Sequence, residues 1–482
     1  MTESHPLESS GISEKKTRKP GSNGLGVTRR AVVAGAAWSV PAIMVAQSAS
    51  AASVSCYPVG TLFRAQARGI LLSGFLGGVN LDNVATLQGE RALVPDQSTP
   101  TSTRFGTTSV AALNTLQINA TGLTGALSTL LSVAAPAGVG VLDQYAFANI
   151  DGTSRGAAGA VDNQGQLELN AASATFPDFA TLDLRRILTG IGGTLASTLV
   201  GQVTDLRLQI GAVTGRAAIQ SACVPSTLNI QRDYQVTRLN LVLASPVLAS
   251  IVAAVTATLG AVSALSLPVL PITVNSTAIF AGNIPGGAQP IQAQLGVTPA
   301  TITVDLLSLL GPAPGQPGNT PFGTYSAYFN SLPPNSTLFV DNNLALPAAA
   351  INTFTTALVS TLTTRLQANI LVNGVPLSAA TGVVVGTING LLNTLLNTTL
   401  TPLIASVQSA LLTPLFSALT TLINIDVNAQ NRSTNPPGPA AWDSLPARRF
   451  DVAALYIRAL GVVNLLDLFL ARGSVGENTP QP

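Results

Sequence analysis

The stretch VVVGTINGLLNTLLNTTLTPLIASVQSALLTPLFSALTTLI, residues 383–423, forms most of a segment from Leu366 to Ile425 that carries no formal charge. A segment this rich in leucine, valine and alanine is not stable facing water, so the rest of the chain, a partner or a lipid must cover it. It does not predict a membrane span, because polar residues interrupt every run of about 20 apolar residues. We therefore interpret it as the element around which the core is built.

The spacing within this segment predicts helices. Residues 383–400 have the helical period, and asparagines four positions apart should form one polar stripe while the leucines face a core. Two Thr-Pro-Leu triplets predict helix restarts, each with Thr as N-cap and Pro at the first helical position. Packed in this way, the helices should leave no ligand cavity. The stripe is Asn389, Asn393 and Asn397, and the triplets are 401–403 and 413–415.

Patterns elsewhere in the chain predict strands and further helices. Residues 139–170 predict an antiparallel meander, with strands at 141–148, 157–161 and 166–169 and turns between them. Alternating stretches at 206–219 and 230–242 precede Ser245-Pro246, which predicts the start of an almost wholly apolar, buried helix at 247–265. Helices at 184–200 and 346–371 and strands at 301–306, 449–460 and 462–471 complete the pattern. The predicted fold class is α+β, with mostly antiparallel β-sheet meander elements packed with long apolar helices.

The N-terminal residues predict an export signal over residues 1–51. A basic stretch ends in Arg29-Arg30, a short apolar run follows, and Ala49 and Ala51 offer small residues for signal cleavage. The paired arginines favour the twin-arginine route over an ordinary Sec leader with incidental arginines. Residues 52–482 would then form the mature region as one compact unit, and the Pro/Gly-rich loop 311–321 is where a domain boundary would fall if the chain has one.

Removal of this leader would change the charge balance and restrict the chemistry. Of the 23 Lys and Arg residues six precede Ala52, so 17 remain, all arginine, against 18 of the 21 acidic residues. With no basic patch, we expect no nucleic-acid partner. The only histidine, His5, is also lost, which excludes a Ser-His-Asp triad and an imidazole metal site. The GTSRG sequence at 152–156 is therefore interpreted as a glycine-rich turn rather than a nucleophile elbow.

Only carboxylates remain for catalysis, as in glycosidases. They are scattered singly along the mature chain, which makes a carboxylate-dependent glycan hydrolase the less favoured reading. Two Asp/Asn clusters, 341–343 and 426–428, lack full calcium-ligand spacing and are interpreted as turn residues. We assign no catalytic, metal or cofactor-binding residue.

Cys56 and Cys223 are the only cysteines. In the oxidising compartment that export implies, an even count predicts one disulfide between them, and two buried free thiols are the alternative. A lipid-modified Cys56 is not supported, because the preceding Ser53-Val54-Ser55 lacks the pattern of a lipobox.

Three stretches of the chain together resemble the choice-of-anchor G family of actinobacterial surface proteins: GVLDQYAFANIDGTSRGAAGAVDNQGQLELN (140–170), the helix-and-proline series 390–423, and FDVAALYIRALGVVNLLDLFLARGSVGEN (450–478). The resemblance implies an exported protein with no established activity and a variable C-terminal attachment device, which this chain does not recognisably carry.

These observations favour a non-catalytic secreted or cell-envelope-associated structural or adhesion-type protein, located outside the cell or at its surface. The alternative is an extracellular carrier of lipids or other hydrophobes, because the apolar helices carry only a thin polar stripe. Partners would be components of the cell wall or envelope, with no transmembrane span in the mature chain.

Overall fold

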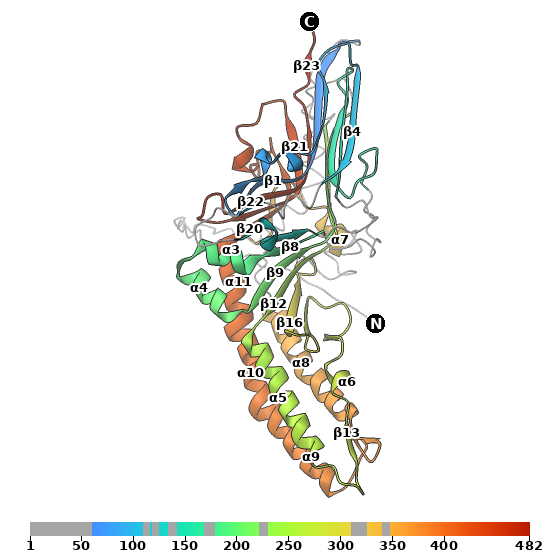
Figure 1. Cartoon of the computed structure of the whole chain (residues 1–482), viewed down its shortest axis with the longest axis vertical. Helices are drawn as coiled ribbons and strands as arrows, with labels where there is room; N and C mark the ends of the chain where they lie inside the picture. Colours follow the sequence, from blue (N-terminus) through green and yellow to red (C-terminus); the bar gives the residue numbers. More distant parts are fainter. Residues whose placement is uncertain are drawn as a thin grey trace, which may run out of the picture. The chain divides into compact units, whose positions relative to one another are not determined.

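The computed structural model describes residues 60–108, 116–117, 125–133, 142–167, 179–220, 230–309, 325–339 and 348–482 (Figure 1). All of them belong to one compact unit, Ser53–Pro482, and the other unit, Met1–Ala52, lies outside the described residues. The fold is mixed α+β, with 37% strand and 33% helix in antiparallel sheets. The predicted fold class is confirmed.

The largest sheet brings together the first described strand and the last strands of the chain. Its order is β17-β20-β21-β22-β1-β2, and β3 and β23 also pair with β1. The strands are β1 (Phe63–Leu76), β2 (Val79–Asn80), β3 (Glu90–Val94), β17 (Ser336–Thr337), β20 (Ile423–Gln430), β21 (Phe450–Ala459), β22 (Leu466–Val475) and β23 (Thr479–Pro480). β20 begins directly after the helix over Val383–Leu422, so the longest helix among the described residues leads straight into this sheet.

A five-stranded sheet packs on the largest sheet through glycines. A Cβ atom on Gly156 would lie 2.2 Å from the carbonyl oxygen of Arg68, and one on Gly473 would lie 2.4 Å from the carbonyl oxygen of Gly156. Backbone therefore meets backbone at this interface, and any side chain there would push the sheets apart. The sheet has the order β11-β10-β7-β6-β4, with β4 (Thr101–Thr107), β6 (Asp143–Asn149), β7 (Ser154–Gly159), β10 (Val213–Ile219) and β11 (Ile230–Val236).

The predicted meander is confirmed for its first two strands, β6 and β7, which pair antiparallel. Of the third predicted strand, 166–169, only residues 166 and 167 are described, and Leu167 forms a bridge with Val161.

A seven-stranded sheet links these strands to the helices. Its order is β14-β15-β16-β12-β9-β8-β5, and its members alternate buried and partly exposed side chains, as half-buried strands do. The strands are β5 (Leu131–Val133), β8 (Ala180–Asp183), β9 (Asp205–Ile210), β12 (Leu239–Ala244), β14 (Asn283–Ile284), β15 (Ile291–Gln294) and β16 (Thr301–Asp305). The helix predicted at 184–200 is divided at Gly192, which has a φ of 68°, into α3 (Leu184–Ile191) and α4 (Gly193–Gln202).

Three long helices lie side by side and form what we call the helical arm, residues 246–280 and 348–422 (Figure 1). They are α5 (Pro246–Ser263), α8 (Ala348–Asn369) and a continuous helix over Val383–Leu422 that comprises α9 (Val383–Thr394), α10 (Thr401–Ser406) and α11 (Thr413–Leu422). The arm also contains the short helix α6 (Ser276–Phe280) and a three-stranded sheet of β13 (Ile272–Val274), β18 (Ile370–Val372) and β19 (Val375–Pro376).

The two predicted helix restarts are wrong, because the helix does not stop at either proline. π-Helical turns at Leu395–Leu400 and Val407–Leu412 immediately precede Thr401-Pro402 and Thr413-Pro414, and neither threonine has an N-cap conformation. A proline lacks the N–H and its ring collides with the carbonyl four residues earlier, so a wider turn before it lets the helix continue. The Thr401 hydroxyl instead donates to the carbonyl oxygen of Leu396 at 2.8 Å.

The predicted orientation of the longest helix is confirmed. The asparagines of the stripe are exposed, whereas Leu392, Leu395 and Leu400 are buried in the core. The predicted start of α5 is also confirmed, since the Ser245 hydroxyl accepts the N–H of Leu248 at 3.4 Å and Pro246 occupies the first turn.

The expectation that α5 is buried is wrong. Only one face of α5 is covered, and 28% of its most apolar window is buried, against 44% for the helix Val383–Leu422. By length and composition both helices could cross a membrane, with mean hydropathy 1.8 for α5 and 1.5 for Val383–Leu422. The outer face of α5 consists of alanine, serine, threonine and glycine. Because these residues are small and only weakly polar, hydropathy alone does not distinguish this exposed face from a buried one.

Candidate functional site

The residues assigned to the export signal, its cleavage and the disulfide lie outside the described residues. These are Arg29 and Arg30, the cleavage alanines Ala49 and Ala51, and the cysteines Cys56 and Cys223. The export signal and the disulfide therefore stay predictions. The Asp/Asn cluster 341–343 and the loop 311–321 are also outside the described part of the chain.

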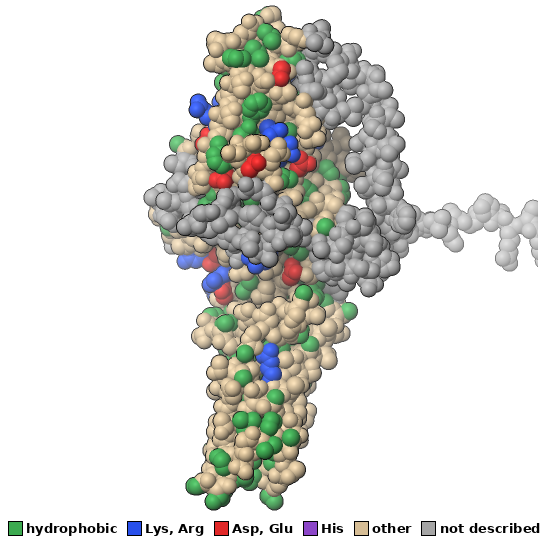
Figure 2. Space-filling model, turned by 90° about the vertical axis from the view of Figure 1, so that its right-hand side faces the viewer, with side chains coloured by type: hydrophobic (Ala, Val, Ile, Leu, Met, Phe, Trp, Pro, Cys, Tyr) green, Lys and Arg blue, Asp and Glu red, His purple; other side chains and the backbone are tan. Residues whose placement is uncertain are grey.

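The helical arm has an almost uncharged surface. Its only charged residue is Arg365, whose guanidinium donates to the carbonyl oxygens of Ala281 at 2.6 Å and Ile279 at 3.3 Å. Figure 2 shows one face of the arm, which is tan and green below the sheets apart from one blue patch. The exposed side chains there are hydroxyls, amides and small apolar groups instead of ionised groups. Examples are Thr356, Thr364, Asn393, Ser409 and Ala410.

One end of the arm exposes large hydrophobic side chains. Val269 is 88% exposed and Val383 89% exposed, and Leu267 and Val375 are also exposed. Leu267 and Val269 lie between α5 and β13, Val375 lies in β19, and Val383 is the first residue of α9. The two loops meet where the N–H of Asn373 donates to the carbonyl oxygen of Pro271 at 2.8 Å. We call residues 264–271 and 373–383 the arm tip.

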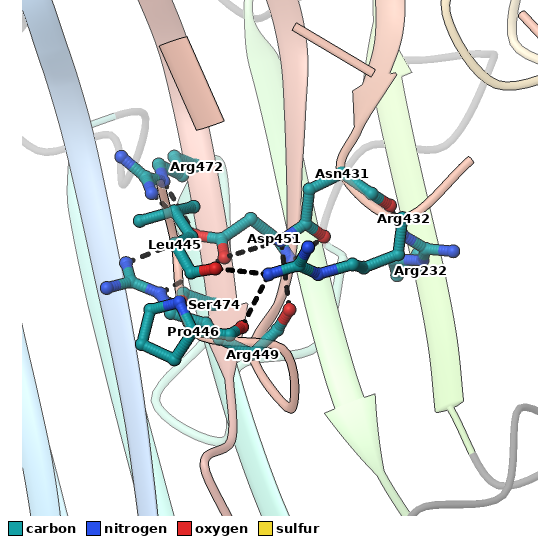
Figure 3. A network of polar contacts seen from close by, with 9 residues as sticks. All are labelled: Arg232, Asn431, Arg432, Leu445, Pro446, Arg449, Asp451, Arg472 and Ser474. Carbon is teal, nitrogen blue, oxygen red and sulfur yellow. Dashed lines mark hydrogen bonds and ion pairs between the residues drawn. The ribbon is translucent and has the colours of Figure 1, made fainter. Parts of the chain in front are cut away.

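The charged residues are concentrated in the sheets, where one carboxylate is completely buried (Figure 3). Asp451 of β21 accepts hydrogen bonds from the Nε atoms of Arg472 at 2.8 Å and Arg449 at 3.1 Å. Burial disfavours the ionised carboxylate, but the two guanidiniums outweigh it and hold the pKa of Asp451 below its ordinary value. Such a buried, paired charge is costly to form and more costly to break.

The same network joins two sheets. The side-chain oxygen of Asn431 accepts the N–H of Asp451 at 2.8 Å, and the backbone carbonyl oxygen of Asn431 accepts a hydrogen bond from the guanidinium of Arg232 of β11 at 2.6 Å. Burial lowers the pKa of Arg232 to about 10. Arg432 donates to the carbonyl oxygen of Pro446 at 2.6 Å, which holds the loop before β21 against the end of β20 (Figure 3). These contacts hold the two sheets together, so we interpret the network as structural.

An aromatic ladder covers the neighbouring part of the same sheet. Trp442 stacks on Phe469 with ring centroids 4.5 Å apart, and Phe469 stacks on Tyr456 at 4.2 Å. A guanidinium lies over the ring at each end of the ladder. That of Arg472 is 4.7 Å from the Trp442 ring centroid, and that of Arg458 is 5.3 Å from the Tyr456 ring centroid. The rings are almost fully buried, so the ladder stabilises the sheet.

The interpretation of residues 426–428 as a turn is wrong, because they lie within β20. The Asp426 carboxylate accepts the hydroxyl of Thr337 at 2.6 Å and the amide of Asn424 at 2.9 Å, and it lies 3.5 Å from Arg458. Its oxygens are committed to the protein. Across the described ranges no three His, Cys, Asp or Glu side chains come together as metal ligands would.

The expectation that the packed helices enclose no ligand cavity stays a prediction, but one face of α5 borders an open groove. The groove has a volume of about 1140 Å³ and lies between α5, the start of β9 and the loop 297–300. Its α5 side is made of Ala249, Ala253 and Ala257 with Val252 and Thr256, and its sheet side carries charged groups. Small side chains at spacing i, i+4 and i+8 leave this hollow, and that spacing is a signal that the sequence did contain. The charged residues at the groove are Asp183, Arg185, Arg186, Asp205 and Arg207.

The fold and these surfaces define an α+β protein with a charged sheet region and an uncharged helical arm. The family model described as a domain of unknown function (DUF8394) matches residues 67–318 and 368–476, and the chain belongs to that family. No curated protein and no solved structure matches the chain. The resemblance to choice-of-anchor G proteins stays a prediction.

Proposed function

We infer that the protein is a non-catalytic adhesion protein of the cell envelope, which attaches to an uncharged, apolar layer through the arm tip. The observation that carries this proposal is the combination of an arm with a single, internally bonded charge and a tip with exposed valine and leucine. Several large apolar side chains exposed at one end of a protein are typical of an interaction site.

The chemistry of the arm favours a lipid layer as the partner. Inserting the tip would transfer Val269 and Val383 from water to an apolar phase. This transfer favours binding by about 1.5 kcal/mol or more for each side chain. No ionised group on the arm would have to be desolvated except Arg365, which already contacts backbone carbonyl oxygens. The arm would therefore approach an uncharged surface at little electrostatic cost.

Flotation with phosphatidylcholine vesicles tests this proposal. The mature protein should float with the vesicles, and Val269→Asp combined with Val383→Asp should weaken binding about tenfold or more. Val463→Asp is the matched control, because Val463 is 87% exposed in the turn between β21 and β22, away from the arm tip. Binding should also be insensitive to salt, since no charge pair contributes. Absence of flotation, or equal loss in the control, would contradict the proposal.

The proposal also requires export. Replacing Arg29 and Arg30 by lysine should retain the precursor in the cell, and N-terminal sequencing of the extracellular form should begin close to Ala52. Undiminished export of the lysine variant would argue for the Sec route and leave the adhesion proposal untouched.

A further inference from the structure

We propose that the groove along α5 binds a single-chain amphiphile with an anionic head group, its chain along the alanine face and its head group at the arginines of α3 and β9. Nothing in this proposal depends on the arm tip. The groove lies at the base of α5, directly after its N-cap Ser245, whereas the tip follows the C-terminal end of that helix.

The apolar part of the groove has the dimensions of a short chain. Ala249, Ala253 and Ala257 stand in line over about 12 Å of helix, at 1.5 Å rise per residue. Val252 and the loop residues Val297 and Pro299 form the side walls. A volume of about 1140 Å³ is large enough for a drug-sized or lipid-sized molecule, and a concave, mostly apolar surface with convergent polar groups is typical of ligand sites.

The charged end of the groove is already organised within the protein. The guanidinium of Arg207 forms two contacts of 2.9 Å with the Asp205 carboxylate, so that carboxylate is neutralised. The other carboxylate, Asp183, accepts the N–H of Arg186 at 2.9 Å as the N-cap of α3. Both acidic groups therefore have partners within the chain.

The positive groups outnumber the acidic ones at this end. Arg185 donates its Nε to the carbonyl oxygen of Val203 at 3.0 Å, and Arg186 donates to the hydroxyl of Thr129. Neither the carbonyl oxygen of Val203 nor the hydroxyl of Thr129 carries a charge. With three arginines and two aspartates, the end of the groove has a net charge of +1, which favours a carboxylate or phosphate head group.

The pair Ala253→Trp and Ala261→Trp tests occupancy of the groove. Both alanines are exposed on α5, but only Ala253 lines the groove, so the indole fills it in one variant and points to solvent in the other. Calorimetric titration with decanoate should give one site in the wild type and in Ala261→Trp, and at least about tenfold weaker binding in Ala253→Trp. No decanoate binding by the wild type, or equal binding by the two variants, would overturn the proposal. Thermal unfolding verifies that both variants are folded.

The head-group assignment has its own test. Arg186→Gln removes the excess charge without unpairing Asp205 from Arg207, and it should weaken decanoate binding about tenfold while leaving the binding of uncharged 1-decanol unchanged. Equal weakening of both ligands would reject the anionic head group. Vesicle flotation of Ala253→Trp should equal that of the wild type, whereas the tip variants should retain decanoate binding. Failure of one proposal is therefore distinguishable from failure of the other.

Discussion

The sheets and the helical arm belong to the same very apolar chain, but they place charged side chains in opposite ways. The sheets place charge inside the protein, with Asp451 fully buried between Arg449 and Arg472. The arm excludes charge almost completely and covers its leucines with small and uncharged polar side chains. In the sheets, buried ionic contacts fix which strands and loops meet, whereas the arm is held by apolar packing alone along most of its length.

The difference indicates that the surface of the arm serves something other than folding. An exposed helix face usually carries Lys and Glu, which cost nothing in stability and keep a protein soluble. The arm has no Lys or Glu, and its only charged residue is Arg365. Core packing does not explain this composition, because exposed positions tolerate charged side chains. The predictions below examine whether the two regions differ in this way.

Removal of the buried carboxylate should have the largest effect. Asp451→Ala would leave Arg449 and Arg472 buried without a counter-charge and should lower the free energy of unfolding by about 3–5 kcal/mol, measured by urea denaturation. Asp443→Ala, at an exposed position, should change it by no more than about 0.5 kcal/mol. Equal effects would remove the distinction between buried and exposed charge on which the comparison depends.

The same carboxylate gives stability a pH dependence of known sign. Its pKa is lower in the folded protein than in the unfolded chain, so its contribution is present above the ordinary carboxyl pKa of about 3.9 and is lost as the pH falls through the lower folded value. The stability difference between the wild type and Asp451→Asn should therefore be constant from pH 7 to 5 and shrink below about pH 4. A difference that grew on acidification would show that the pKa is shifted the other way.

In the arm, stability should depend on leucines rather than on the polar stripe. Leu395 is 3% exposed, and Leu395→Ala should cost about 2–5 kcal/mol by leaving a cavity. Asn393→Ala on the outer face of the same helix should be neutral or slightly stabilising, because alanine is the better helix former. Similar costs at both positions, measured in the same denaturation experiment, would mean that the outer face is covered by something.

Glycines should separate the two regions by the sign of their effect. Gly156→Ala would bring a Cβ to 2.2 Å from the Arg68 carbonyl oxygen, which forces the sheets apart and should cost about 3 kcal/mol. A Cβ on Gly390 in α9 would meet nothing within 4 Å, so Gly390→Ala should stabilise the protein by about 1 kcal/mol. Thermal unfolding should show opposite shifts, and shifts of the same sign would refute the glycine-mediated contact.

The smallest effect on stability should come from charging the arm. Thr364→Lys together with Asn393→Lys places two charges on exposed helix positions and should change the free energy of unfolding by less than about 0.5 kcal/mol for each. A control pair in the sheet region, Thr103→Glu and Arg104→Gln, should be similarly small, since no buried partner is lost. A large loss of stability in the arm variant would mean that the missing charge is a folding requirement after all.

Much of the fold follows from local patterns. The helical period at 383–400 and the Ser245-Pro246 cap lead to the observed helices, because a helix face and its N-cap are set by residues within a turn or two. Alternation at 206–219 gives β9 and β10 for the same reason. The prolines at 402 and 414 do not restart the helix, since π-helical turns before them, with buried leucines, let the helix continue.

The candidate sites depended on longer-range relations. The sequence by itself determined that residues 366–425 have no charge, that their leucines need covering, and that the chain after its N-terminal stretch has no histidine or lysine, because composition and period need no partner to be recognised. Only the tertiary structure decided that Gly156 meets Arg68, that Asp451 lies between two arginines, and that the alanines of α5 face a groove instead of a core. Those outcomes depend on which element packs on which, and in a chain with so many apolar faces only the complete set of contacts selects one arrangement.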